Sequence, residues 1–191
     1  MVKSAYSKLE VEIPADVKVQ VKEMMVDVSG PLGSISKDFS HARGVRISKT
    51  DNKVILDAFY PDKKKLALLG TVRSRIVNMI NGVTRKFRYE MKMVYAHFPI
   101  SVEYDSTKNI LLIKNFLGER SARKAYVLPG VDIRISGDTV ILEGIDREKV
   151  GQTAANIQRA TKIRQKDPRV FGDGIYVYRK YVGDKLEWKI L

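Results

Sequence analysis

An internal repeat limits the possible folds of this 191-residue chain more than any other feature of its sequence. Two segments recur in the same order in the second half: Arg46-Ile47-Ser48 as Arg134-Ile135-Ser136, and Val54-Ile55-Leu56 as Val140-Ile141-Leu142. Their offsets are 88 and 86 residues, which predicts a turn two residues shorter in the second half. Leu32-Gly33 also matches Leu117-Gly118, at an offset of 85. Ordered matches of this kind predict an internal duplication, with two copies of one small fold.

The spacing of apolar residues predicts the same elements in each half. Valines alternate with polar residues over 17–21 and 26–28, and a polar turn at 48–52 joins two more alternating segments, which indicates strands and a hairpin. From Leu66 to Val83 apolar residues recur every three or four positions, so we expect an amphipathic helix that ends at Asn81-Gly82. The second half closes with a helix that turns these residues inward: Val150, Ala154, Ile157 and either Ala160 or Thr161.

We therefore predict an α+β protein of two tandem homologous domains, each an antiparallel sheet packed with one main helix. The expected domains are residues 1–82 and 83–191. Strand hairpins followed by a single helix do not form the alternating units of a parallel, doubly wound sheet.

The net charge of +13 indicates an anionic partner. Residues 1–83 hold 14 basic and 9 acidic side chains, and residues 84–191 hold 21 and 13, so the net charges are +5 and +8. We expect the second domain to contribute more of any RNA affinity, and Lys63-Lys64-Lys65 to form a solvated loop. A basic soluble protein without such a partner is the plain alternative.

Several classes of function lack the residues that they need. The chain has no cysteine, which excludes disulfides and thiolate chemistry, and its two histidines stand 56 positions apart. Acidic residues do not cluster as a metal site requires, so neither a metal nor a cofactor is expected. Without a long apolar run or signal core, we expect a soluble protein that is not exported.

The most basic segment follows the second predicted helix, with Arg159, Lys162, Arg164, Lys166 and Arg169 against the single acid Asp167. The first two cations are expected in the last helical turns, where a favourable interaction with the helix dipole is an alternative role. Pro168 should end this helix, and a loop through Gly172 and Gly174 could then approach an RNA backbone closely.

Aromatic residues accompany both basic segments of the second half. Ile175 and Val177 alternate with Tyr176 and Tyr178, so a short strand should present its tyrosines on one face, either to RNA bases or to the protein's own sheet. Residues 84–93, TRKFRYEMKM, interleave Phe87 and Tyr89 with the basic residues Arg85, Lys86, Arg88 and Lys92, which could also form a solvated strand face.

Enzymatic and other nucleic-acid-binding motifs fit the sequence less well. The GPLG of residues 30–33 matches the GxxG loop of KH modules, but it lies between strand-like segments, so we expect a strand–turn–strand. GDG at 172–174 lacks the spacing of a dinucleotide-binding loop, and His97 has no identifiable nucleophile partner. We therefore expect no catalytic site.

Four longer motifs together resemble one known family. GPLGSISKDF (30–39), NGVTRKFRYEMKMVYAHFPI (81–100), FLGER (116–120) and KDPRVFGDGIY (166–176) are similar to the universal large-subunit ribosomal protein counted sixth in bacteria and ninth in eukaryotes. VYAHFPI and FGDGIY resemble its eukaryotic and archaeal branch. One departure is Arg85-Lys86 before Phe87, where a small residue such as Gly is expected.

The resemblance implies two homologous domains and a structural role near the sarcin–ricin loop and stalk base of the large subunit. The implied partners are large-subunit rRNA, neighbouring ribosomal and stalk-base proteins and nearby translation factors, but no membrane. The implied location is the cytoplasmic ribosome, with a nucleolar stage if the source is eukaryotic. Carried onto this chain, the rRNA contacts fall on Arg164, Lys166, Arg169, Phe171, Gly172, Asp173, Gly174, Tyr176 and Lys180. A free RNA-binding regulator is the alternative.

Overall fold

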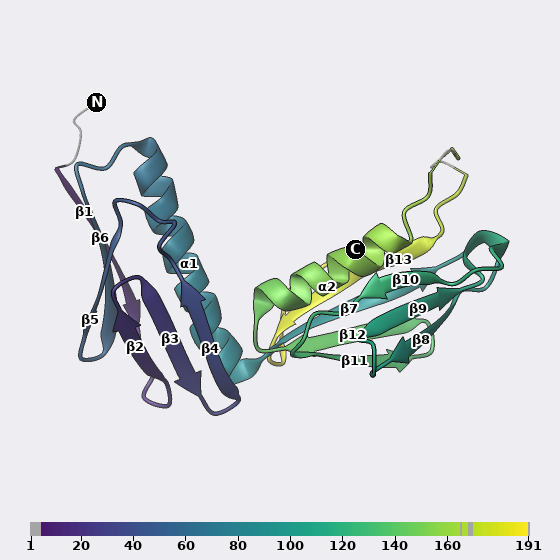
Figure 1. Ribbon diagram of the computed structural model, residues 1–191, viewed down its shortest axis with the longest axis horizontal. Helices are drawn as coiled ribbons and strands as arrows, with labels where there is room; N and C mark the ends of the chain where they lie inside the picture. The colour runs from purple at the N-terminus through teal and green to yellow at the C-terminus, as the bar shows by residue number, and fades with distance from the viewer. Residues whose placement is uncertain (1–4, 165, 168–169, 191) are drawn as a thin grey trace. The chain divides into compact units, whose positions relative to one another are not determined.

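The computed structural model describes residues 5–164, 166–167 and 170–190, and separates into two compact units, Met1–Arg85 and Lys86–Leu191 (Figure 1). The expected α+β class is confirmed, because each unit combines antiparallel strands with one long helix. In each unit the strands form two sheets rather than one.

The N-terminal unit consists of two three-stranded sheets and a helix. One sheet has the order β1-β6-β5, from Tyr6–Glu12, Lys53–Phe59 and Arg46–Thr50. The other has the order β2-β3-β4, from Lys18–Lys22, Met25–Gly30 and Gly33–Asp38. Helix α1, Lys63–Arg85, packs on strands of both sheets. Its apolar stripe explains this packing, since Leu69, Val72 and Ile76 are buried.

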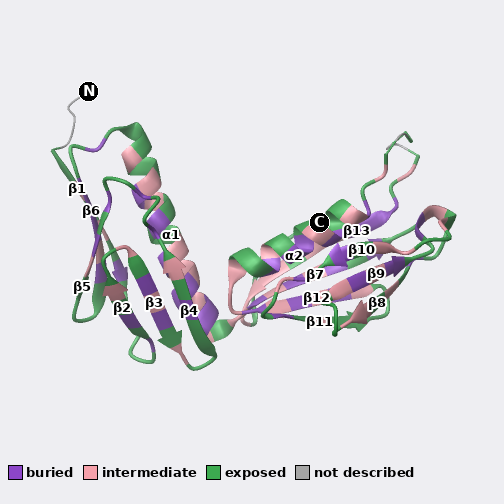
Figure 2. Ribbon diagram, viewed as in Figure 1, coloured by how far each residue is buried: buried purple, intermediate pink, exposed green. Residues whose placement is uncertain are grey.

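The C-terminal unit repeats this arrangement and adds two strands. Its larger sheet has the order β11-β12-β7-β13-β14, from Val131–Ser136, Thr139–Gly144, Phe87–Val94, Gly174–Val182 and Lys185–Lys189. Its smaller sheet has the order β10-β9-β8, from Arg123–Tyr126, Ile110–Lys114 and Ser101–Asp105, with a 3₁₀ turn at Phe116–Gly118. Helix α2, Arg147–Ala160, packs on both sheets. Figure 2 shows exposed residues on the outward side of both helices.

The duplication is confirmed, but the expected alignment of its hairpins was wrong. Thr50 pairs with Lys53 and Ser136 pairs with Thr139, so both hairpins have two-residue turns and a constant offset of 86 relates them. Ile133, not Ile135, is therefore the counterpart of Ile47. Burial agrees, because Ile135 is 40% exposed whereas Ile133 packs against the core. The two Arg-Ile-Ser segments are therefore identical in sequence, but they do not occupy equivalent positions in the two hairpins.

The GPLG segment joins two strands, as expected. Gly30 ends β3, Gly33 begins β4, and the two residues pair across the hairpin. A Cβ at Gly30 would lie 2.7 Å from a methyl group of Val83, so the absence of a side chain allows close packing on α1. A GxxG loop of the KH type joins two helices, so this segment is not one.

Both ends of α1 differ from expectation. Lys63-Lys64-Lys65 form its first turn rather than a loop, because the Asp62 carboxylate accepts a hydrogen bond from the backbone N–H of Lys65 at 2.7 Å. The helix also continues beyond Asn81-Gly82 to Arg85, with Gly82 and Val83 buried. Lys86 then adopts a left-handed φ of 57°, a conformation that favours Gly, which accounts for the small residue expected there.

Candidate nucleic-acid interface

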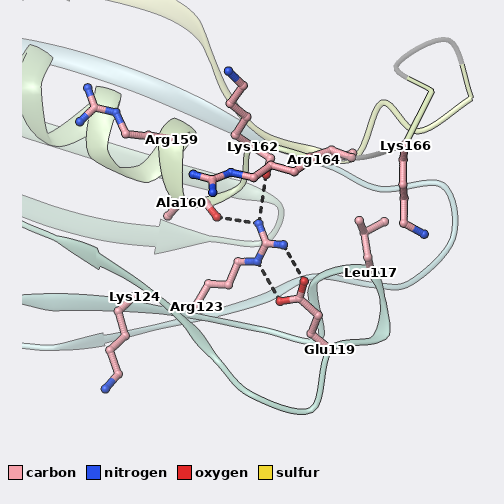
Figure 3. Close-up of a pocket in the computed structure, with 10 residues that line it drawn as sticks. Leu117, Glu119, Arg123, Lys124, Arg159, Ala160, Lys162, Arg164 and Lys166 are labelled. Atoms are coloured by element: carbon pink, nitrogen blue, oxygen red, sulfur yellow. Dashed lines mark hydrogen bonds and ion pairs between the residues drawn. The ribbon is translucent and has the colours of Figure 1, made fainter.

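A basic groove of about 600 Å³ lies in the C-terminal unit between the end of α2, the start of β10 and the turn at Phe116–Gly118. Six of its ten lining residues are cations, and one is an acid (Figure 3). The cations are Arg123, Lys124, Arg159, Lys162, Arg164 and Lys166. Four of them were predicted from the sequence, and the structure places these four together.

Arg123 organises the groove. Its guanidinium binds both carboxylate oxygens of Glu119, with Nε–Oε2 at 2.8 Å and Nη2–Oε1 at 2.5 Å. The same side chain donates to the backbone carbonyls of Ala160 at 2.9 Å and Lys162 at 3.2 Å (Figure 3). It also lies over the Phe116 ring, at 4.3 Å from the ring centroid. Arg123 thus ties β10 to the end of α2 and fixes the backbone that carries the predicted cations.

The single acid of the groove is neutralised by this contact. Hydrogen bonds from Arg123 hold the pKa of the Glu119 carboxyl below its ordinary value, against a smaller opposing effect of burial. Glu119 therefore stays ionised at neutral pH with its charge already paired. Most of its repulsion toward an anionic ligand is removed.

The remaining cations are available to a ligand. Arg159, Lys162, Arg164 and Lys166 are exposed, and within the described part of the chain none of them forms an ion pair. Together with Lys124, which is also exposed, these five cations around one groove create a strong local positive potential. Phosphate groups of a nucleic acid match this arrangement better than a small neutral ligand does.

Helix α2 ends earlier than expected. It stops at Ala160, well before Pro168, so Lys162 lies beyond the helix rather than in its last turn. The buried hydroxyl of Thr161 donates to the carbonyl of Gln158 at 3.2 Å and accepts from the N–H of Ile175 at 3.1 Å. The chain therefore leaves the helix where Thr161 joins it to β13, and residues 162–164 and 166–167 of the basic segment follow without helix or strand.

Asp173 holds the loop before β13 in place. Its side chain is 1% exposed and accepts from the N–H of Ala96 at 2.8 Å, and it lies 3.1 Å from Nδ1 of His97. His97 stacks on Phe171 with ring centroids 4.7 Å apart, and Nζ of Lys166 lies 4.4 Å from the centre of the Phe171 ring. Asp173 is thus buried and internally bound, so its part in a binding site is to position Phe171 and Lys166.

Burial opposes the ionisation of Asp173, but hydrogen bonding outweighs it. Removal from water acts to raise the pKa of this carboxyl, while the N–H groups of Ala96 and His97 and the His97 ring lower it. The net result is a lowered pKa. The carboxylate therefore remains ionised and bound to these groups at neutral pH.

The two glycines of this loop differ in the space that surrounds them. Neither Gly172 nor Gly174 has a positive φ, so the backbone conformation does not require glycine at either position. A Cβ at Gly174 would lie 2.7 Å from the Tyr176 ring, which packs over it, whereas a Cβ at Gly172 would meet nothing within 4 Å. The exposed Gly172 therefore leaves room for the close approach of a ligand backbone, and Gly174 does not.

The strand after this loop follows the predicted alternation in its first half. Ile175 is buried and Val177 packs on the core, while Tyr176 and Phe171 line a second groove of about 830 Å³ beside α2. A bulge then interrupts the register between Val177 and Arg179. Tyr176 is half-exposed, so it both covers its own sheet and remains open to a ligand.

The other predicted contacts lie outside the basic groove. Arg88 stacks on Tyr181 at 4.2 Å and lies 3.6 Å from Glu90, and Lys180 lies over the rings of Tyr89 and Trp188. Both side chains are thus engaged within the protein. Arg85 ends α1, Lys86 precedes β7, and Arg169 lies outside the described residues.

Sequence reasoning missed Arg123, Lys124 and Glu119. Arg123 and Lys124 are adjacent in the sequence and follow Arg120, but they meet the cations of 159–166 only through the fold. The motif FLGER at 116–120 was the available signal, since it includes Glu119. Across the part of the chain that the structure describes, no group of acids and histidines could hold a metal ion, and no helix could span a membrane.

Comparison with known proteins gives one consistent result. The family model described as ribosomal protein L6 matches residues 13–86 and 98–174. The chain is 49% identical over 180 residues to large ribosomal subunit protein uL6 of Staphylothermus marinus, which covers 93% of this chain and 97% of that protein. Identity to uL6 of Aeropyrum pernix is 48% over 182 residues, covering 95% and 99%. Identity to uL6 of Methanobrevibacter smithii is 45% over 180 residues, covering 94% and 99%.

Proposed function

The chain belongs to the ribosomal protein L6 family, in its archaeal and eukaryotic branch, and from this we propose that it is a structural constituent of the large ribosomal subunit. In this role it binds large-subunit rRNA and acts without catalysis. Its place of action is the cytoplasmic ribosome, with a nucleolar stage if the source is eukaryotic.

The observation that carries the rRNA-binding role is the basic groove of the C-terminal unit. Five exposed cations surround it, and its one acid is already paired with Arg123. The exposed Gly172 and half-exposed Phe171 and Tyr176 lie beside the cations, where they can contact ribose and exposed bases. Such a surface reads the shape of structured RNA through phosphates and 2′-hydroxyls.

We further propose that residues 83–191 form the main rRNA-binding domain, and that the contact lies near the sarcin–ricin loop and the stalk base. Neighbouring ribosomal proteins, stalk-base proteins and translation factors would then be close. The charge difference between the halves, +5 against +8, supports this division of labour.

Gradient sedimentation tests the ribosomal role. The chain should remain with large subunits at high salt, because an integral subunit protein is held by many contacts at once. A free RNA-binding regulator would be washed off under the same conditions. Release at moderate salt would therefore overturn the proposal in favour of the regulator.

A cross-linking experiment tests the proposed location. A photo-reactive residue at Lys124, inside the groove, should cross-link to a defined rRNA segment in purified large subunits. The same residue at Lys49 on β5 is the control. Equal rRNA cross-linking from both positions, or none from Lys124, would contradict the assignment of the groove.

A further inference from the structure

The duplicated sheets differ at one edge. In the C-terminal unit, β7 pairs with β12 on one side and with β13 on the other. In the N-terminal unit, the equivalent strand β1 pairs only with β6 among the described residues (Figure 1). The edge of β1 that corresponds to the β13 side of β7 therefore carries no strand in the described part of the unit. Arg73 of α1 donates from Nε to the Glu10 carbonyl at 3.4 Å there, so this side chain must move aside for a strand to pair with β1.

Register establishes that β1 and β7 are equivalent strands. Leu9 lies opposite Leu56 in one unit, as Tyr89 lies opposite Leu142 in the other. Lys8 and Glu10 of β1 then occupy the positions of Arg88 and Glu90 of β7. The same charge pattern appears on both strands, and β7 carries an added strand despite it. Charged side chains can protect an edge strand from pairing, but this pattern does not do so in β7.

A groove of about 460 Å³ runs beside this edge, between β1 and α1. Its apolar lining comes from Val11, Pro14, Val77 and Ile80, and Val77 is only half-buried. In the C-terminal unit, β13 packs against α2, with Ile175 fully buried. The N-terminal groove thus offers apolar surface to a strand that the described part of the unit does not supply.

We propose that the β1 edge and this groove accept an extended segment of a partner protein, which adds to the sheet as an antiparallel strand. Main-chain hydrogen bonds to an open edge give such contacts their affinity, and alternate side chains in a groove give them specificity. The segment should place β-branched aliphatic residues toward α1, as β13 does toward α2. This surface is independent of the basic groove, so it goes beyond rRNA binding.

The second copy also bears on the charge that the partner strand needs. Arg179 of β13 lies opposite Glu90, and their charged atoms are 3.6 Å apart. Glu10 is the counterpart of Glu90 on β1. A basic residue opposite Glu10 would join Lys8 and Lys53, which already bind that carboxylate at 2.7 and 2.8 Å. Lys8 and Lys53 thus already neutralise Glu10 within its own unit, so the partner segment needs no basic residue there and is recognised by its β-branched side chains.

The test uses the full chain and a synthetic peptide with the sequence of residues 174–182, GIYVYRKYV. This peptide should bind saturably and slow amide hydrogen exchange over 6–12, while a scrambled peptide of the same composition should not. Val77→Asp should weaken peptide binding at least tenfold. Ser74→Asp, with the same charge change on the exposed side of α1, should leave it unchanged.

Affinity for rRNA should be equal in both variants, which separates this surface from the basic groove. The proposal is overturned if the peptide does not bind at about 1 mM. It is also overturned if protection appears on other strands but not on β1, or if Val77→Asp binds the peptide normally. Self-association of the chain through β1 without peptide would identify a second copy as the occupant and would equally contradict a partner protein.

Discussion

The two units have one fold but differ at the end of the helix and at the edge of the sheet. Helix α1 runs to Arg85, directly before β7, whereas α2 stops at Ala160 and is followed by an irregular basic segment. The C-terminal sheet also gains β13 and β14. The cations Lys162, Arg164 and Lys166, the Asp173 contacts and the Phe171 stack lie on these additions, whereas Arg123, Lys124 and Arg159 lie on elements that both units share. The candidate binding surface thus combines residues of the shared fold with residues that only the C-terminal unit has.

The largest losses of stability are expected from Leu→Ala substitutions at equivalent positions in the two cores. Leu56 and Leu142 are equivalent and fully buried. Replacing either with Ala should lower the free energy of unfolding of its own unit by about 3 kcal/mol, through lost burial and a cavity. Thermal unfolding followed together with rRNA binding checks this. On heating, Leu142→Ala should lose rRNA binding early, and Leu56→Ala should not.

Equal loss of rRNA binding in both leucine variants would contradict the proposed difference between the units, because it would mean that the binding surface requires both units to be folded.

The next effect concerns Asp173, which the N-terminal unit does not duplicate. Asp173→Ala should cost about 1–3 kcal/mol, since the partly buried N–H of Ala96 loses its acceptor. Asp173→Asn should cost less, because its amide oxygen can still accept that hydrogen bond. Chemical denaturation should rank the three proteins by free energy of unfolding, with the parent highest, Asp173→Asn next and Asp173→Ala lowest. Equal stability of Asp173→Ala and the parent would show that the loop does not depend on this contact.

The pH dependence of stability follows from the same residue. The pKa of Asp173 is lowered in the folded protein, so its stabilising contribution is complete above its unfolded value of about 4. It is lost as pH falls through the lower folded pKa. The parent should therefore lose more stability than Asp173→Asn as pH falls below about 4. Parallel stability curves would contradict this.

A smaller effect is expected from Arg123→Lys, which keeps the charge but not the forked geometry. The lysine cannot bind Glu119 through two nitrogens and also reach the carbonyls of Ala160 and Lys162. We expect a loss of about 1–2 kcal/mol in stability and weaker rRNA binding. If affinity follows charge alone, Arg123→Lys will bind normally, and the fixed helix end is then not needed for binding.

The sequence predicted the elements and the duplication because both depend on local periodicity. It placed the hairpin alignment wrongly because Arg-Ile-Ser recurs by chance two positions out of register, which only strand pairing reveals. The sequence also predicted that Pro168 ends α2. The helix instead ends at Ala160, and the next residue, Thr161, is buried and hydrogen-bonded to β13. Arg123 and Lys124 could not be placed in the site, because β10 meets the end of α2 only in the folded chain.

The most direct test of the account compares three cations from each unit. One variant replaces Lys162, Arg164 and Lys166 with Ala, and its control replaces Lys63, Lys64 and Lys65 of the first turn of α1. Both remove the same charge, and both should change stability by within about 0.5 kcal/mol per site. The measurement is affinity for large-subunit rRNA over a series of salt concentrations.

The account predicts that the slope of log affinity against log salt flattens by about 2–3 in the groove variant, at roughly 0.7–0.9 per lost phosphate contact. The control should keep the parent slope. Equal flattening in both variants would show that binding depends on total charge, and an unchanged slope in the groove variant would show that these cations do not contact phosphate. Either result would contradict the claim that the C-terminal groove is the main rRNA-binding surface.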